Sequence, residues 1–238
     1  MASALLLAAG KATRLEGIRD TYAKANVPVG DTTPLRFLLE SIGTSFSDIW
    51  INLHFKGDQV REQAERFVSR GVNLHFIEED PLLGTGGTLL EMLARSGALP
   101  EVLVNAKMFT DFSFDSLISA PPGTLVLHGD SDLKSFGGLS YDDEGFIQGL
   151  CTRDAALESY KSAAVFTGIC KPSPTWLKHL KAARQHKESE VLCFIRHGLL
   201  PALKEDPKHA RAMLHAGAWC EISTPERVAE ATAQLAKL

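Results

Sequence analysis

Apolar runs alternate with amphipathic segments along the first half of the chain. A continuously apolar run at residues 4–8 ends at a glycine, which is typical of a strand buried on both faces. Apolar residues then recur at helical spacing over residues 34–45. Further strands are predicted at 48–53, 72–77 and 102–104, and further helices at 59–68 and 88–94. This alternation predicts a parallel sheet covered by helices, with ligands bound beyond the carboxyl ends of the strands.

The pattern changes in the second half of the chain. Two short apolar segments, 138–141 and 146–150, flank a turn-rich stretch and predict a β-hairpin. Other strands are predicted at 124–128, 163–169 and 218–222, and helices at 175–184, at 191–203 and from Pro225, with Thr224 as N-cap. The predicted fold class is α/β, a Rossmann-like three-layer α/β/α arrangement with a mostly parallel mixed sheet and an inserted hairpin. No repeat or long linker interrupts the sequence, so we expect a single domain over residues 1–238.

Composition and charge exclude several classes of protein. The chain has 25 Lys and Arg against 29 Asp and Glu, a net charge of −4, and 45% hydrophobic residues, unlike a disordered chain. Nucleic acids and anionic membranes select basic surfaces, so neither partner is expected. Four scattered cysteines form no CxxC pattern, and no apolar run approaches the roughly 20 residues of a membrane span. We therefore expect a cytoplasmic protein and leave open whether it forms a homo-oligomer.

The segment after the first predicted strand has the composition of a phosphate-binding loop. It reads Leu7-Ala8-Ala9-Gly10-Lys11-Ala12-Thr13-Arg14-Leu15. Small residues let the backbone approach a ligand closely, and an arginine can bind two phosphate oxygens at once. The segment matches neither the Walker loop nor the GxGxxG fingerprint. An ordinary turn with solvated cations is the structural alternative.

Seven segments resemble, in chain order, the motifs of the sugar-phosphate nucleotidyltransferases, the NDP-sugar pyrophosphorylase family. Residues 7–15 resemble its L-A-A-G-x-G-T-R-L signature, and residues 104–112 resemble N-G-D-x-F-T-D-F. The other matching segments are 23–29, 51–55, 81–87, 166–169 and 219–227. The similarity covers nearly the whole chain, and its compact length is similar to that of the short bacterial members.

The resemblance implies a reaction and a set of residues. Family members bind a nucleoside triphosphate, and an oxygen of a sugar 1-phosphate attacks its α-phosphorus and releases pyrophosphate, a step of nucleotide-sugar biosynthesis. Arg14 would hold the triphosphate and Lys24 would neutralise charge near the attacked phosphate, so these are the expected catalytic residues. The residues expected to bind the nucleotide are Leu7, Ala8, Ala9, Gly10, Lys11, Arg14, Gly84, Thr85 and Gly86, and those expected to bind the phosphorylated small molecule are Asn105, Gly137 and Gly168.

Structural alternatives remain for several of these residues. Lys24 is otherwise a solvated loop lysine, and the segment 84–87 is otherwise a plain turn. Asn52 and His54 are expected to be structural rather than catalytic.

The chain departs from the family at its Mg²⁺ and sugar motifs. Lys107 stands where the family has the metal-binding aspartate of N-G-D, and lysine cannot ligate magnesium. Glu221 replaces the second aspartate and keeps the charge with one more methylene, so it is a candidate metal ligand. Asp111 is a second candidate, although the family also has an aspartate there and a helix-initiating residue is the favoured structural alternative. Ala12 replaces a signature glycine, and residues 151–154 replace the E-K-P segment whose acid holds sugar hydroxyls.

These departures leave three hypotheses. In the first, the chain is a nucleotidyltransferase in which the Lys107 ammonium compensates phosphate charge in place of the metal. In the second, catalysis is lost or weakened, and the fold binds nucleotide or a partner enzyme. In the third, the acceptor is a phosphorylated compound other than a sugar. The sequence does not determine the nucleobase or the acceptor.

Overall fold

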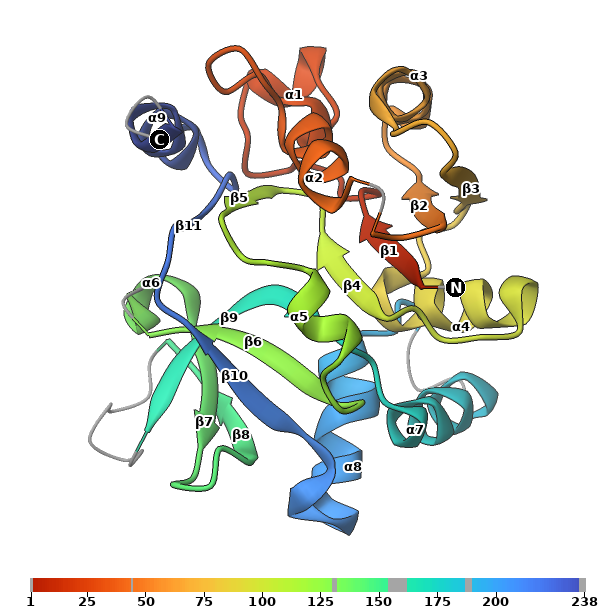
Figure 1. Ribbon diagram of the computed structural model, residues 1–238, viewed down its shortest axis with the longest axis vertical. Coiled ribbons are helices and arrows are strands. Elements are labelled where there is room, and N and C mark those ends of the chain that lie inside the picture. Colours follow the sequence, from red (N-terminus) through yellow and green to blue (C-terminus); the bar gives the residue numbers. More distant parts are fainter. Residues whose placement is uncertain (1, 44, 130–131, 154–161, 187–189, 236–238) are drawn as a thin grey trace. The chain divides into compact units, whose positions relative to one another are not determined.

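The structure is a computed structural model that describes residues 2–43, 45–129, 132–153, 162–186 and 190–235 (Figure 1). The chain divides into two compact units, each built from separate stretches of sequence. The first unit comprises Met1–Leu82, Val104–Phe114 and Ala218–Leu238, and the second comprises Leu83–Leu103 and Asp115–Gly217. The expectation of a single domain stays a prediction.

The first unit contains the predicted parallel strands. They are β1 (Ser3–Leu7), β2 (Asp48–Leu53), β3 (Asn73–Glu78) and the end of β4 (Val102–Asn105), in the order β4–β1–β2–β3. The β1–β2 and β2–β3 pairs are both parallel, and Ser3 lies opposite Asp48. The register therefore aligns the carboxyl ends of β1 and β2.

Helices and a short turn of helix cover these strands. They are α1 (Ile18–Thr21), η1 (Lys24–Asn26), α2 (Pro34–Ile42) and α3 (Gly57–Phe67). Thr33 caps α2 by accepting the Arg36 N–H at 3.2 Å, and Pro34 occupies the first turn. The leucine and isoleucine side chains at helical spacing are buried, as the sequence predicts, while α3 packs against β2 and β3.

A small antiparallel pair completes the first unit. It joins β5 (Met108–Thr110) to β11 (Trp219–Glu221), with Met108 opposite Glu221. The sequence predicted β11 but not β5. Helix α9 (Pro225–Leu235) follows, and the Thr224 hydroxyl accepts the Arg227 N–H at 3.5 Å, in the predicted capping position. This pairing brings the segments around residues 107 and 221 side by side.

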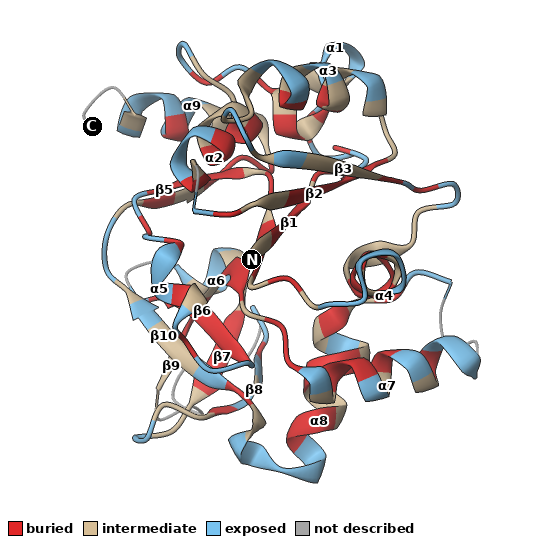
Figure 2. Ribbon diagram, turned by 45° about the vertical axis from the view of Figure 1, so that its right-hand side comes forward, coloured by how far each residue is buried: buried red, intermediate tan, exposed pale blue. Residues whose placement is uncertain are grey.

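The second unit carries the mixed part of the sheet. Its strands are β6 (Thr124–His128), β7 (Gly138–Tyr141), β8 (Ile147–Cys151), β9 (Ala163–Cys170) and β10 (Arg211–His215). The order is β10–β6–β9–β4, with β10 parallel and β9 antiparallel to β6. The predicted hairpin is β7–β8, which continues the sheet through β9. β6 is buried along its length (Figure 2).

Several helices of the second unit pack on one another. They are α4 (Gly84–Ser96), α5 (Asp115–Ile118), α6 (Leu133–Phe136), α7 (Pro174–Gln185), η3 (Ile195–Leu199), α8 (Leu200–Glu205) and η4 (Pro207–His209). Helix α7 contacts α4, η3 and α8. The fold class is the predicted one, a mostly parallel mixed sheet with helices on both faces and a hairpin.

Two predicted helices differ from the structure, and a second strand besides β5 was not predicted. Helix α4 begins at Gly84 rather than at residue 88, because its glycines let the first turn pack tightly against the segment 192–194. The helix predicted from residue 191 instead contains a π-helical turn, η3, before α8. Strand β10 was missed because its partly exposed residues show little alternation.

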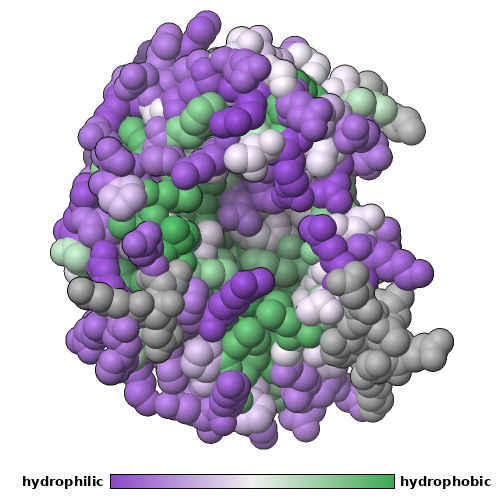
Figure 3. All heavy atoms as spheres, turned by 180° about the vertical axis from the view of Figure 1, so that it is seen from behind, coloured by the Kyte–Doolittle hydropathy of each residue, from purple (hydrophilic) through white to green (hydrophobic). Residues whose placement is uncertain are grey.

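Within the part of the chain that the structure describes, none of the helices has the length and apolar character needed to cross a membrane. The rim of the face drawn in Figure 3 is mostly hydrophilic, and hydrophobic side chains gather toward its middle. The exposed large hydrophobic residues include Tyr22, Leu150, Val191 and Leu214. Such scattered side chains are usual on a protein surface.

Candidate functional site

The loop after β1 is held in place by a buried asparagine. The N–H groups of Ala8 and Ala9 donate to Asn52 Oδ1 at 2.6 Å and 3.1 Å, and Asn52 Nδ2 donates to Glu79 Oε1 at 2.8 Å. Asn52 and Glu79 are 4% and 3% exposed. Asn52 therefore has the structural role expected of it. The N–H groups at Ala8 and Ala9, two of those considered for phosphate binding, already have a protein acceptor.

Ala12, which stands where the signature has a glycine, combines a left-handed backbone with a buried methyl group. Its φ of 54° lies in the left-handed region, which costs a non-glycine residue roughly 1–2 kcal/mol. Its methyl group is buried in a hydrophobic cluster with Leu15, Val27, Val29 and Phe109. Burial of this methyl group offsets part of that cost, and the Cβ packs into the unit rather than remaining exposed on the loop.

Lys24 lies beside the same loop. A Cβ added to Gly10 would lie 3.9 Å from Lys24 Cδ, so the lysine stem runs alongside the glycine. Burial, and then the charge of Lys107, lower the pKa of Lys24 to about 7, against the opposing effect of Glu221. The charges of Arg14 and Arg227 contribute to the same lowering. Lys24 is thus a partly buried member of a charged cluster, not the solvated loop lysine of the structural alternative.

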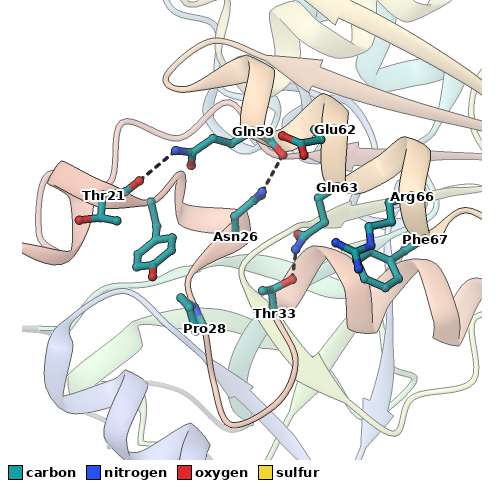
Figure 4. Close-up of a pocket in the computed structure, with 10 residues that line it drawn as sticks. Thr21, Asn26, Pro28, Thr33, Gln59, Glu62, Gln63, Arg66 and Phe67 are labelled. Atoms are coloured by element: carbon teal, nitrogen blue, oxygen red, sulfur yellow. Dashed lines mark hydrogen bonds between the residues drawn. The ribbon is translucent and has the colours of Figure 1, made fainter.

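A network of hydrogen bonds fixes the backbone that carries Lys24. Gln59 of α3 accepts the Ala23 N–H at 2.9 Å and donates to the Thr21 carbonyl at 2.9 Å, while Asn26 Nδ2 donates to the Gln59 carbonyl at 2.7 Å. These bonds tie η1 to α3 (Figure 4). They border a pocket of about 410 Å³ lined by Thr21, Tyr22, Asn26, Pro28, Thr33, Gln59, Glu62, Gln63, Arg66 and Phe67. None of the predicted site residues lines this pocket.

Lys107 and Glu221 form the centre of the charged cluster. The Lys107 ammonium donates to Glu221 Oε2 at 2.5 Å and lies 3.5 Å from Ser223 Oγ. Ser223 Oγ and Arg227 Nη1 also donate to the Glu221 carboxylate. Burial raises the pKa of Glu221, but Lys107, Ser223 and Lys24 outweigh it and hold the pKa at about 2. Glu221 is therefore a carboxylate at neutral pH.

The residues at this position do not fit a Mg²⁺ site. Magnesium takes octahedral oxygen donors, usually carboxylates together with water and phosphate oxygens. Here Lys107 is a cation, and both Glu221 oxygens already accept hydrogen bonds from Lys107, Ser223 and Arg227. No group of three or more His, Cys, Asp or Glu side chains that could hold a metal occurs among the described residues. This donor set therefore does not support the expected Mg²⁺, nor the role of metal ligand considered for Glu221.

The glycine-rich segment 84–87 is the first turn of α4, not a loop. The Gly86 N–H donates to the Leu192 carbonyl at 2.8 Å, and Thr85 Oγ1 accepts the Phe194 N–H at 3.1 Å. A Cβ on Gly86 would lie 2.6 Å from Leu180 Cδ2, and one on Gly84 2.6 Å from the Leu192 carbonyl oxygen. Packing within the second unit thus explains these glycines, and their role at the base and ribose stays a prediction.

The remaining predicted residues are divided between the two units. Leu7 ends β1, and Lys11 follows in the exposed part of its loop. Asn105 ends β4 in the first unit, and its carbonyl accepts the Lys107 N–H at 2.8 Å. Gly137 and Gly168 belong to the second unit, with φ values of 68° and 88° that favour glycine. Asp154, at the position of the sugar-contact segment, lies outside the described residues.

Lys24, Lys107 and Glu221 belong to one charged cluster of the first unit, while Arg14 is exposed on the loop after β1 and acts on the cluster through its charge. Two further residues of the cluster were not predicted from the sequence. Arg227 and Ser223 reach Glu221 from the turn and helix that follow β11. The signal was present, because both lie in the segment 219–227 that resembles the family's last motif.

Comparisons with known proteins identify the fold. No family model matches the sequence. A glucose-1-phosphate thymidylyltransferase from Bacillus anthracis matches with a TM-score of 0.80 and 18% identity, over 100% of this chain and 96% of that one. A UDP-glucose pyrophosphorylase in complex with UDP-glucose matches at 0.78 and 16% identity, over 100% and 99%. The CTP:phosphocholine cytidylyltransferase LicC of Streptococcus pneumoniae matches at 0.70 and 18%, over 99% and 100%.

The chain therefore has the fold of the nucleotidyltransferases. The resemblance to sugar-phosphate nucleotidyltransferases that the sequence motifs indicated is confirmed for the fold, at identities of 16–18%.

Proposed function

We propose that this protein is a nucleotidyltransferase that transfers a nucleoside monophosphate from a nucleoside triphosphate to a sugar 1-phosphate or a similar phosphorylated small molecule, with release of pyrophosphate. The observation that carries this proposal is the cluster of cationic side chains beside the loop after β1, in a chain with the nucleotidyltransferase fold. Lys107 and Arg227 both pair with the Glu221 carboxylate, and Lys24 adds a further partly protonated amine to the cluster, so positive charge exceeds negative charge among these four side chains. Such a site attracts phosphate groups.

The proposed transfer needs compensation of the phosphate charge and does not need a protein nucleophile. An oxygen of the acceptor phosphate forms a bond to the α-phosphorus, and the bond from that phosphorus to the leaving pyrophosphate breaks with its electron pair. Catalysis of such transfers is mostly positioning and electrostatic stabilisation. Each pair of opposite unit charges 4 Å apart is worth about 4 kcal/mol at an effective dielectric constant of 20. Lys24 and Arg14 would bind the phosphate chain and stabilise the charge that develops on it.

A second candidate function is nucleotide binding without transfer, or docking on a partner enzyme. The Lys107–Glu221 ion pair favours it, because an ammonium group cannot bridge and orient two phosphate oxygens as a divalent ion does. The cytoplasmic location, the oligomeric state and the lack of nucleic-acid or membrane partners stay predictions under either function.

Pyrophosphate release separates the two candidates. The wild-type protein is mixed with ATP, GTP, CTP, UTP or dTTP and with a panel of sugar 1-phosphates and phosphocholine, with Mg²⁺ or with EDTA. The proposal expects release with at least one pair and its loss in Lys24→Met. Lys178→Met is the matched control, because Lys178 is an exposed lysine of the second unit that pairs with Glu205. No release with any pair, from folded protein that binds nucleotide, would refute transfer in favour of the second candidate.

A further inference from the structure

The cluster around Glu221 is arranged with its cations toward solvent and its carboxylate beneath them. The Lys107 side chain is 30% exposed and that of Arg227 18%, whereas Glu221 is 3% exposed. Lys24 belongs to the same cluster, because the charges of Lys107 and Glu221 both shift its pKa. A ligand that approaches from solvent therefore meets the ammonium and guanidinium groups before it meets the acid.

On the basis of the nucleotide binding proposed above, we infer that the polyphosphate of the nucleotide binds this cluster without a divalent cation. Its oxygens replace the Glu221 carboxylate as the acceptor of the hydrogen bonds that Lys107 and Arg227 donate. In this inference Glu221 is an internal competitor of the ligand, not a metal ligand. Added Mg²⁺ then weakens nucleotide binding.

The exchange is chemically balanced because phosphate oxygens replace carboxylate oxygens as acceptors. Before the exchange, Glu221 accepts hydrogen bonds from the Lys107 ammonium, from Ser223 Oγ and from one Arg227 nitrogen. Non-bridging phosphate oxygens accept the same hydrogen bonds, and a guanidinium group can hold two of them. Ser223 stays with Glu221 after the exchange, so the carboxylate keeps one donor in its buried position.

The effect of Mg²⁺ follows from charge. A magnesium ion bridges the β- and γ-phosphate oxygens of a nucleotide and neutralises part of their charge. At a site with two carboxylates the ion adds contacts that outweigh this loss. At this site an ammonium group stands beside the Glu221 carboxylate, and the ion therefore weakens the attraction between the phosphates and the cluster and brings its own charge close to Lys107.

Isothermal titration calorimetry of the wild-type protein tests the inference. The probes are ATP, GTP, CTP, UTP and dTTP, each titrated in EDTA and in excess Mg²⁺ at equal ionic strength. The Kd of the nucleotide that binds is expected to be roughly threefold to tenfold higher in Mg²⁺ than in EDTA. Binding that requires Mg²⁺ would overturn the inference and leave the proposed nucleotide binding in place. Absence of binding under both conditions would overturn both.

Two substitutions in the cluster sharpen the test. Glu221→Gln keeps the shape of the side chain and removes the competing charge, so the Kd in EDTA is expected to fall about twofold to tenfold. Lys107→Asp places a second carboxylate beside Glu221, so Mg²⁺ is expected to strengthen binding instead of weakening it. Lys178→Met, the exposed control, is expected to behave as wild type.

Folding of each variant is checked by its far-ultraviolet circular dichroism spectrum and melting curve. If Glu221→Gln does not fold, Lys107→Met replaces it, and its Kd in EDTA is expected to rise at least about fivefold. A folded Glu221→Gln variant that binds nucleotide more weakly than wild type would contradict the role of Glu221 as a competitor. Unchanged binding by folded Lys107→Met would contradict the role of the ammonium.

Discussion

Nucleotide binding should weaken as the pH rises through the pKa of Lys24. Burial and the charge of Lys107 lower that pKa to about 7 in the free protein, so the side chain loses its proton within the physiological range. A bound phosphate favours the ammonium form and raises the pKa again. Nucleotide affinity is therefore highest below pH 7 and falls above it.

The size of the effect follows from the fraction of Lys24 that is charged. With a pKa of about 7, that fraction falls from about 0.9 at pH 6 to about 0.1 at pH 8, and the Kd should rise about tenfold over this range. At pH 7.5 binding should take up about 0.8 proton at Lys24, because that share of the side chains is neutral before binding. Glu221, with a pKa of about 2, does not titrate in this window.

Calorimetry at pH 6, 7 and 8 measures the Kd, and titrations in two buffers of different ionisation enthalpy measure the proton uptake. Lys24→Arg is the matched control, because an arginine keeps its charge in this range and any titration of the nucleotide itself remains. The Kd of this variant should change less with pH than the Kd of wild type, because the contribution of Lys24 to the pH dependence is removed. An equal pH dependence of the two proteins would refute the assignment of the titration to Lys24.

Three further predictions concern stability. Asn52→Leu should lower the free energy of unfolding in urea by about 2–4 kcal/mol, because it leaves the Ala8 and Ala9 N–H groups without their acceptor; a loss below about 0.5 kcal/mol would contradict this. Gly86→Ala should destabilise by about 1–3 kcal/mol, since its Cβ would lie 2.6 Å from Leu180, whereas Gly149→Ala, with open space, should change stability by less than about 0.5 kcal/mol. Glu221 has a folded pKa of about 2, below its ordinary 4.5, so its contribution to stability is present above pH 4.5 and is lost as the pH falls toward 2. Acid unfolding followed by circular dichroism should show that loss in wild type and not in Glu221→Gln.

Hydrophobic patterning predicted the first unit well for a physical reason. Strands buried on both faces and helices with one buried face leave strong signals, as at Asp48–Leu53 and Pro34–Ile42. Patterning failed where tertiary packing decides the backbone. The segment 84–87 contains three glycines and suggests a turn, yet close contact with the segment 192–194 makes it the start of a helix.

The charged cluster was only partly predictable. The motifs identified Lys24 as a position where the chain resembles the family pattern, and Lys107 and Glu221 as positions where it departs from that pattern. The sequence could not show that Glu221 is bonded by Ser223 and Arg227, because this depends on how α9 leaves β11. Nor could it show that Asn52, 44 residues from Ala8, holds the loop after β1.

Equilibrium dialysis of the folded wild-type protein against ATP, GTP, CTP, UTP and dTTP in EDTA tests most directly whether the cluster around Glu221 is a phosphate site. We expect at least one of these nucleotides to be retained, and retention to fall in Lys107→Met but not in Lys178→Met. Retention of none of them, with EDTA or with Mg²⁺, would contradict the account.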